Sequence, residues 1–486
     1  MAARKFAPWL GAAAFVFSSS LALAVTDADR AAVYRDFLTQ YQARNYAGAQ
    51  PLAEQLVALT EEQYGAEDLQ LTNPLTNLAT VHYRQGHFPE AIEAYQRTLR
   101  ILQAKSTMAD KAQIIPLHGL GVSFLGNKDP ASAVVALKRA ADLSRNTDGL
   151  YNINQVEFID PLIEAYAATG RYPEAEKEAL YALRVEEAAY GRNSLQLVPR
   201  LEKLAEWYEY DRRYTSERNA YERALAILAR SAPEHDLRRV SPLRGIARAY
   251  RLEAFYGAEG ADLGGSFNTG SGAPVFTDGT QQRRGEASLI AALTAVEANE
   301  PVNLHLRGAV LTDLGDWFLV SNVLRRAYDT YAEAWKAFAQ VDSTRLLSQP
   351  RLMAYRPSIS SVDRSQLDPA EAVVKVVELR FTVDRDGRVD NVTSPTTDVP
   401  EAIVRNCMAS MRRARFAPRI DNGLAVPTED VVFQERVLIR APSQSDPASS
   451  GKAEESTPAE KAESPAEPAQ KPAEKPAEES SEKKPE

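Results

Sequence analysis

The stretch LATVHYRQGHFPEAIEAYQRTL, residues 78–99, decides the fold because its pattern returns along the chain at a constant interval. Alanine recurs every 42 residues, at Ala49, Ala91, Ala133 and Ala175, and Glu217 stands at the next step. An aliphatic residue recurs with the same interval at Leu78, Leu120, Leu162, Leu204 and Ile246. One unit of this size cannot bury its own apolar face, so the repeat predicts a stack of similar units.

Each unit has the spacing of two amphipathic helices joined by a tight turn. In the quoted stretch the turn falls at Gly86, and Phe88 begins the second helix three residues before Ala91. A small residue at the alanine position lets the two helices approach closely, while aromatic residues such as Phe88 fill the space between them. Glycines that lie at multiples of 42 residues from one another predict the C-caps of second helices; they are Gly65, Gly149 and Gly191.

This pattern resembles the tetratricopeptide repeat, in the 42-residue form found in kinesin light chains. The resemblance covers residues 29–340 and implies an α-solenoid of about seven helical hairpins. A glycine-rich insertion, residues 257–285, interrupts the sixth unit and includes Phe267, Val275 and Phe276. Two interpretations of this insertion stay open: an excursion without a role, and a loop that reaches over the groove or a partner.

Beyond a predicted linker at residues 341–368, the apolar spacing changes from helical to alternating. Apolar residues occupy every second position from Val377 to Val383, which predicts a strand with one buried face. Asp386-Gly387 predicts a hairpin turn, and an apolar helical stripe follows before a last strand. We therefore expect a mainly α chain whose solenoid is followed by a small α+β domain of ββαβ order.

Residues 369–441 resemble the carboxy-terminal domain of TonB-type energy transducers. The matching positions are Asp386-Gly387, Arg415-Phe416, Pro418 and Asn422-Gly423, while Ala414 stands where that family usually has tryptophan. The resemblance implies a second contact surface at an exposed sheet edge. It is accompanied by a basic helix face formed by Arg405, Arg412 and Arg413. A solvated helix face without a partner is the alternative for these arginines.

The two ends of the chain have compositions unlike the middle. Residues 1–24 predict a signal peptide, because Arg4 and Lys5 precede an apolar run and Ala22-Leu23-Ala24 supplies a cleavage site. We therefore expect export to the periplasm. Residues 442–486 lack aromatic and branched aliphatic side chains and predict a disordered tail. From Ala441 on, eleven acids and six lysines account for five of the nine net negative charges. The nearly balanced remainder gives no support to nucleic-acid binding.

The first helices of tetratricopeptide arrays line a concave groove, and the resemblance places particular residues there by phase. The uncharged positions are Tyr34, Leu38 and Tyr41 in the first unit, Asn73, Thr76, Thr80 and Tyr83 in the second, and His118 and Val122 in the third. The charged ones are Glu157, Asp160, Glu164, Glu202, Glu206 and Glu209, followed by Arg244, Arg248 and Arg251. They predict a peptide groove with an acidic floor and a basic end. In the alternative, the opposite charges on adjacent helices pair with each other.

Residue types that carry catalysis do not occur in a catalytic arrangement. His82 and His87 lack an acid at ligand spacing, and Cys407, the only cysteine, lies on an apolar helix stripe. We therefore expect a non-enzymatic adaptor without a cofactor or a small-molecule substrate. Its expected partners are proteins or peptides of the cell envelope, outer-membrane proteins among them. The alternative is a TonB-like component of energised outer-membrane transport, anchored by an uncleaved N-terminal helix.

Overall fold

The computed structural model describes residues 27–105, 111–257, 276, 279–357 and 372–440. Within these residues, fourteen α-helices form seven successive hairpins. The first helices are α1 (Asp27–Gln42), α3 (Thr72–Gln85), α5 (Ile114–Gly126), α7 (Val156–Ala168), α9 (Val198–Tyr210), α11 (Val240–Tyr256) and α13 (Leu304–Val320). The second helices are α2 (Tyr46–Tyr64), α4 (Phe88–Lys105), α6 (Pro130–Asp148), α8 (Tyr172–Tyr190), α10 (Tyr214–Ser231), α12 (Gly279–Glu297) and α14 (Leu324–Ala339).

Short 3-10 helices repeat the 42-residue interval before five of the first helices. They are η1 (Leu69–Leu71), η2 (Lys111–Gln113), η3 (Ile153–Gln155), η4 (Leu195–Leu197) and η5 (Leu237–Arg239). The repeating alanines are fully buried where the two helices of a hairpin meet, as at Ala49 and Ala91. Gly65, Gly149 and Gly191 end second helices with φ between 86° and 92°, which confirms the predicted C-caps.

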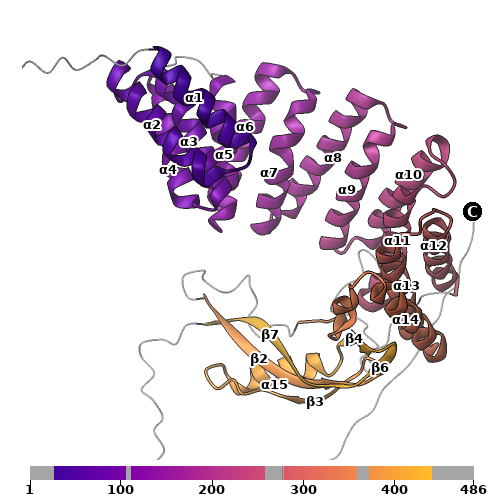
Figure 1. Cartoon of the computed structure of the whole chain (residues 1–486). Helices are drawn as coiled ribbons and strands as arrows, with labels where there is room; N and C mark the ends of the chain where they lie inside the picture. The colour runs from indigo at the N-terminus through magenta and orange to yellow at the C-terminus, as the bar shows by residue number, and fades with distance from the viewer. Residues whose placement is uncertain (1–26, 106–110, 258–275, 277–278, 358–371, 441–486) are drawn as a thin grey trace, which may run out of the picture.

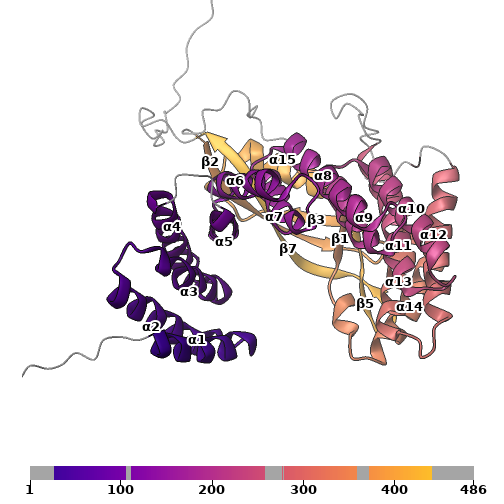
Figure 2. The ribbon, with the colours of Figure 1, turned by 90° about the horizontal axis from the view of Figure 1, so that it is seen from above.

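The hairpins form an arc in which the first helices make the inner layer. First helices of neighbouring units are in contact: α3 contacts α5, and α5 contacts α7. Figure 1 shows the arc running from α1 to α10 and then bending at α11 to α14 toward the C-terminal strands. In Figure 2, helices α6 to α9 pass over those strands, so the C-terminal domain lies beneath the middle of the arc.

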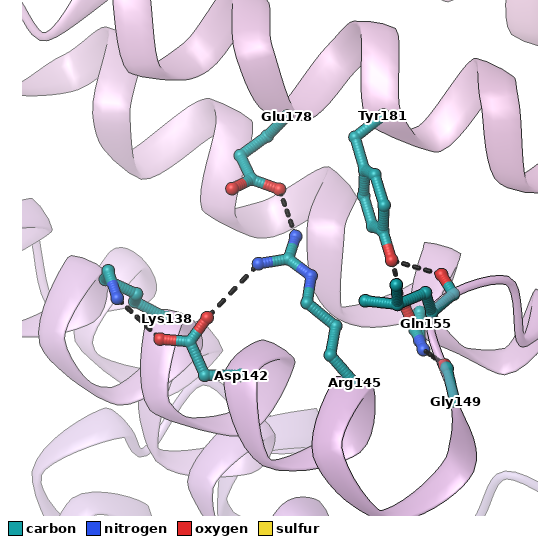
Figure 3. A network of polar contacts seen from close by, with 8 residues as sticks. Lys138, Asp142, Arg145, Gly149, Gln155, Glu178 and Tyr181 are labelled. Carbon is teal, nitrogen blue, oxygen red and sulfur yellow. Dashed lines mark hydrogen bonds and ion pairs between the residues drawn. The ribbon is translucent and has the colours of Figure 1, made fainter.

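Neighbouring units are joined on the second helices by a polar contact that also repeats every 42 residues. The positions are Arg97, Arg139, Tyr181 and Arg223, and each binds a group of the preceding unit or of the segment between units. Figure 3 shows the Tyr181 example, where the hydroxyl donates to Gln155 at 2.8 Å and Gln155 donates to the carbonyl of Gly149. Beside it, Arg145 of α6 contacts both Asp142 of the same helix and Glu178 of α8. These contacts join successive units.

The C-terminal domain has a three-stranded antiparallel sheet of order β3-β2-β7, covered on one face by a helix. Its elements are β2 (Ala372–Val383), β3 (Val389–Thr393), α15 (Glu401–Met411) and β7 (Thr428–Arg440). Val377 and Phe381 of β2 pack with Cys407 and Met411 of α15 in one buried cluster. The predicted fold class, a helical solenoid followed by a small ββαβ domain, is therefore confirmed.

The predicted turn at Asp386-Gly387 requires glycine for two reasons. Gly387 has a φ of 75°, and a Cβ on it would lie 1.9 Å from the carbonyl oxygen of Phe416. The turn is closed by Asp384, whose carboxylate accepts hydrogen bonds from the amides of Asp386 and Arg388 at 2.9 and 2.7 Å. The turn also reaches the solenoid, because Tyr328 of α14 donates a hydrogen bond to Asp386.

The first part of the predicted linker at residues 341–368 is folded. It contains η6 (Thr344–Leu347) and β1 (Arg351–Ala354), which pairs with β4 (Arg415–Ala417). Leu347 and Met353 share one buried cluster with Phe318 and Tyr331 of the last hairpin and with Ala417 and Ile420, whereas the three-stranded sheet and α15 form a cluster of their own. A second small hairpin, β5 (Arg419–Asp421) and β6 (Leu424–Val426), lies against α14.

The predicted insertion at 257–285 is shorter in the structure, because α12 begins at Gly279. The ring of Phe276 packs against Trp317 of α13 in a tilted arrangement, with 5.4 Å between the ring centroids, so this residue contacts the solenoid. Phe267 and Val275 lie outside the described residues, as do the predicted signal peptide and the tail. Among the helices that the structure describes, none combines the length and the apolar character required to cross a bilayer.

Candidate functional site

The 42-residue interval defines a row of equivalent positions along the inner layer, one on each of five first helices. This central row consists of Thr80, Val122, Glu164, Glu206 and Arg248. Its character therefore changes along the groove from uncharged, to apolar, to acidic and then to basic. The structure decides which of these side chains are available to a ligand and which are used within the fold.

A cavity of about 470 Å³ opens where α3, α5 and α7 meet on the inner layer. Its lining residues are Tyr83, Phe88, Val122, Leu125, Gly126, Asp160, Pro161 and Glu164. Aromatic and aliphatic side chains form one part of the wall, and the two carboxylates of α7 form another. The structure thus brings together Tyr83, Asp160 and Glu164, which the repeat phase placed in the groove.

Four of the cavity residues were not among the predicted site residues. Phe88, Leu125 and Gly126 lie at or near the ends of helices, whereas Pro161 lies inside α7. Gly126 makes room for the ring of Phe88, because a Cβ on Gly126 would lie 2.3 Å from that ring. The repeated aromatic residue three positions before the alanine could have indicated Phe88. Which helix ends reach the cavity could not be predicted, because that depends on how successive units pack.

The predicted residues at the N-terminal end of the groove are scattered over the surface. Tyr34 is 43% exposed, and Tyr41 stacks on Phe37 with 5.7 Å between the rings. Asn73 is exposed at the start of α3. None of these three lines the cavity, and their role in binding stays a prediction.

The acidic positions of α7 and α9 divide into paired and unpaired carboxylates. Asp160 is paired: Arg200 contacts it at 2.5 Å and Lys203 at 2.6 Å. Burial raises the pKa of Asp160, but hydrogen bonds from these two cations overcome that effect and lower it. Within the described residues, Glu157, Glu164 and Glu206 are exposed and have no cationic partner.

Glu202 and Glu209 lie deeper on α9. Burial raises the pKa of Glu202, a hydrogen bond from Ser241 opposes the rise, and the nearby Glu206 carboxylate adds to it. Glu209 is paired with Arg248 of α11 at 2.6 Å. Acidic charge that remains available to a ligand is therefore concentrated on Glu157, Glu164 and Glu206.

Glu217 replaces the repeating alanine and is fully buried beside this pair. Neither of its carboxylate oxygens has a hydrogen-bond partner in the structure. Burial is the main cause, and the Glu209 carboxylate the next, of a rise in the pKa of Glu217 to about 9. Glu217 therefore stays protonated at neutral pH and leaves Arg248 to neutralise Glu209.

The arginines of the predicted basic end are all engaged by carboxylates. Arg244 contacts Asp313 at 2.5 Å, and Arg251 contacts Asp316 at 3.3 Å. Both aspartates belong to α13, the next first helix. Asp316 is buried and also accepts from Arg351 of β1, with 2.7 Å between them.

Of the predicted acidic floor, Glu157, Glu164 and Glu206 are exposed without a cationic partner among the described residues, whereas Asp160 and Glu209 are paired. The three arginines of the predicted basic end all form internal ion pairs. The alternative in which opposite charges pair between adjacent helices applies to Arg244, Arg248 and Arg251. It does not apply to Glu164 and Glu206, which face solvent. Arg244 and Arg251 pair with aspartates of α13, and Arg351 of β1 joins them. The sequence could not predict these pairs because α13 and β1 are far from α11 along the chain.

The three arginines of the C-terminal domain lie on the solvent side of α15 and its C-terminal turn. Arg405, Arg412 and Arg413 are exposed, and Arg405 contacts Glu401 one turn away at 2.7 Å. In the described part of the chain, β7 pairs only with β2, so its other edge is open. The domain thus presents an open edge, and whether it binds a partner stays a prediction.

Groups suited to metal or nucleophilic chemistry are dispersed. Among the described residues, no three His, Cys, Asp or Glu side chains gather as ligands for a metal ion. Cys407 is fully buried between α15 and the sheet. The inner layer offers shape, apolar surface and charge, which are the elements of a binding site for another chain.

Similarities to known proteins concern the helical part. A tetratricopeptide repeat family model matches residues 38–104, from α1 to α4. Kinesin-light-chain TPR-like repeats from Podosopora anserina are 18% identical, with 41% of this chain and 95% of that chain covered and a TM-score of 0.38. The C-terminal part of a TPR repeat-containing protein from Cytophaga hutchinsonii is 10% identical, with 64% and 98% covered and a TM-score of 0.42.

A Rap protein solved in complex with competence and sporulation factor is 15% identical, with 64% of this chain and 74% of that chain covered and a TM-score of 0.32. No curated protein matches the chain. The predicted tetratricopeptide repeats are confirmed by the family model and the solenoid. The resemblance of residues 369–441 to TonB-type transducers stays a prediction.

Proposed function

We propose that this chain is an exported, periplasmic, non-enzymatic adaptor that binds a segment of a partner protein along the inner layer of its solenoid. The observation that carries the proposal is the 470 Å³ cavity with unpaired carboxylates beside it. Ligand pockets in proteins commonly have volumes of about 300–1,000 Å³ and combine apolar walls with few polar groups. The cavity has both properties, and it lies on the layer that tetratricopeptide repeats use as a groove.

The C-terminal domain is the second contact in this proposal. Its β7 edge is thirteen residues long and bears unpaired backbone groups on one side within the described residues. Such an edge accepts an added strand from another chain. The domain contacts the last hairpin through β4 and β5, whose Ala417 and Ile420 belong to the buried cluster of that hairpin.

A capture experiment tests the groove. The purified protein is mixed with a periplasmic extract and crosslinked, and its partners are quantified by mass spectrometry. The double variant Glu164→Lys/Glu206→Lys reverses the charge of two exposed side chains without touching the core, so we expect capture of the main partner to fall at least about fivefold. Capture that is unchanged in this variant would count against the groove as the binding surface.

The open β7 edge favours one alternative, a TonB-like component of energised outer-membrane transport. That role requires a retained anchor at the N-terminus. Sequencing of the amino terminus of the mature protein separates the two functions. A chain that begins at Val25 has lost residues 1–24 and excludes the transducer, whereas an N-terminus that retains them in the inner membrane supports it.

A further inference from the structure

The central row sets the chemistry of the segment that the groove would accept. Val122 lies in the cavity wall, Glu164 at its rim, and Glu206 one first helix further along. We propose that the ligand is an extended segment in which a large apolar side chain fills the cavity and basic side chains follow at the spacing of the two carboxylates. This inference rests on the proposed function, because it names the class of segment that the groove binds.

The spacing is derived from the general packing distance of helices. Packed helices lie about 8–10 Å apart, and an extended chain advances about 3.3 Å per residue. One step from first helix to first helix therefore corresponds to about three residues of ligand. An apolar residue beside Val122 would place its third neighbour at Glu164 and its sixth at Glu206. The pattern is apolar-x-x-basic-x-x-basic, in which x is any residue.

The charge state of the groove excludes the opposite ligand. Arg244, Arg248 and Arg251 are occupied by carboxylates of the fold, and Arg200 and Lys203 are both bound to Asp160. The carboxylates that remain without partners are Glu157, Glu164 and Glu206. An acidic segment would meet uncompensated negative charge next to the cavity, whereas a basic one would supply the missing partners.

The apolar position is set by the cavity wall. Tyr83, Phe88 and Val122 face a space that the described residues leave unfilled. An aromatic side chain brings a large apolar area at low conformational cost, so phenylalanine is the residue that we expect to bind tightest. Removal of that side chain from the ligand is expected to have a larger effect than removal of one charge.

Synthetic peptides test the pattern on the purified full-length protein. The probe is a fluorescein-labelled peptide containing Phe-Ala-Ser-Lys-Ala-Ser-Lys, and its reversed order is also measured because the row does not set the direction of the ligand. Three comparison peptides replace phenylalanine by serine, both lysines by glutamate, or all three. Binding is measured by fluorescence anisotropy at low and high salt.

We expect the Phe-Lys peptide, in one of its two orders, to bind tightest. Serine in place of phenylalanine should weaken binding about tenfold or more, because the apolar contact is lost. Glutamate in place of the lysines should weaken it about three- to tenfold at low salt and less at high salt. Equal binding of the serine peptide, or equal binding of the glutamate peptide, would overturn the proposal.

Variants of the protein identify the carboxylates. Glu164→Lys/Glu206→Lys should reverse the preference, so that the Phe-Glu peptide binds more tightly than the Phe-Lys peptide. Glu62→Lys/Glu222→Lys is the matched control, because both residues are exposed on second helices and the change in net charge is the same. A reversal in the control variant as well would show an effect of net charge alone and would overturn the proposal.

The peptide and capture experiments fail in distinguishable ways. If capture from the extract depends on Glu164 and Glu206 but the four peptides show no preference, the groove binds a partner and only the apolar-basic pattern is wrong. If neither capture nor peptide binding responds to the two carboxylates, the proposed function is wrong together with this inference.

Discussion

The inner layer consists of two regions that use the same repeat positions in opposite ways. On α7 and α9 the central row places Glu164 and Glu206 in solvent, whereas on α11 it places Arg248 in an ion pair with Glu209. The neighbouring arginines of α11 are bound by Asp313 and Asp316. Whether a side chain at an equivalent repeat position is exposed or ion-paired therefore depends on the side chains of the neighbouring helices.

The difference arises because the last units have a second neighbour. Asp316 accepts from Arg251 of the preceding first helix, from Tyr331 of its own hairpin and from Arg351 of β1. Strand β1 completes this cluster and so makes this end of the inner layer part of the fold. The comparison teaches that the part of the row with unpaired acidic side chains ends at α9, and three changes test the contacts on the other side of that boundary.

We expect the largest effect for Asp316→Ala, which removes the carboxylate shared by Arg251, Arg351 and Tyr331. It leaves Arg351 and Arg251 without their common partner in a buried setting, and loss of one member of a buried ion pair costs about 3–5 kcal/mol of stability. Urea unfolding followed by circular dichroism measures the loss. Asp313→Ala is the control, because Asp313 is less buried and pairs only with Arg244; its cost should stay near or below 1 kcal/mol. Equal costs would contradict the role of Asp316 as the central acceptor.

A smaller effect is expected for Gly387→Ala, which sharpens the comparison between a turn of the solenoid and a turn of the C-terminal domain. The new Cβ would collide with the carbonyl oxygen of Phe416, so we expect a cost of about 2–4 kcal/mol. Gly86→Ala is matched in backbone conformation, with φ of 80° against 75°, but has open space around it.

The cost of Gly86→Ala should therefore be only the backbone penalty of about 1–2 kcal/mol. Differential scanning calorimetry of both variants separates the two contributions. A cost for Gly387→Ala as low as that for Gly86→Ala would show that the turn moves away from Phe416 without loss.

The third effect is a pH dependence at the boundary between the two regions, measured as a slope over several pH units. Burial and the Glu209 carboxylate raise the pKa of Glu217 to about 9, while Arg248 and Arg218 act against the rise. The unfolded chain releases this proton near its ordinary value of 4.5, whereas the folded chain holds it. Glu217 therefore contributes stability that is complete below pH 4.5 and falls as the pH rises toward 9, by at most about 1.4 kcal/mol per pH unit.

Glu217→Gln removes this titration, so the free energy of unfolding should depend less on pH between 5 and 9. Urea titrations at several pH values measure the slope. Glu222→Gln on the same helix is the control, because Glu222 is exposed and should leave the slope unchanged. A variant at Glu217 that keeps the slope of the unchanged protein would assign the pH dependence to another group.

Much of the helical fold was predictable because its contacts are local. Ala91 with Phe88 and Gly86 describes a hairpin, and the 42-residue interval carries that description to each unit that keeps the phase. Alternation from Val377 to Val383 likewise predicts a strand whose buried face the structure confirms. These patterns report which face of an element is buried, a property that neighbours in sequence decide.

The candidate site was predictable only in part. The phase placed Tyr83, Asp160 and Glu164 on one layer, and the cavity brings them together. The phase could not reveal that Arg244 meets Asp313 across 69 residues or that Arg251 meets Asp316 across 65. It also could not reveal that β1 folds onto the last hairpin, because residues 351–354 are too few to show a period.

The sequence by itself determined the repeat, the two helices of each unit, the change to strands near residue 372 and the glycine turns, because each depends on periodicity or on local backbone conformation. Only the tertiary structure decided which charges of the inner layer remain free. Charge pairing depends on side chains from helices and strands far apart in the chain, and on the burial that they impose on one another. Glu164 and Arg248 occupy equivalent positions, yet the ion pair between Arg248 and Glu209 leaves only Glu164 available to a ligand.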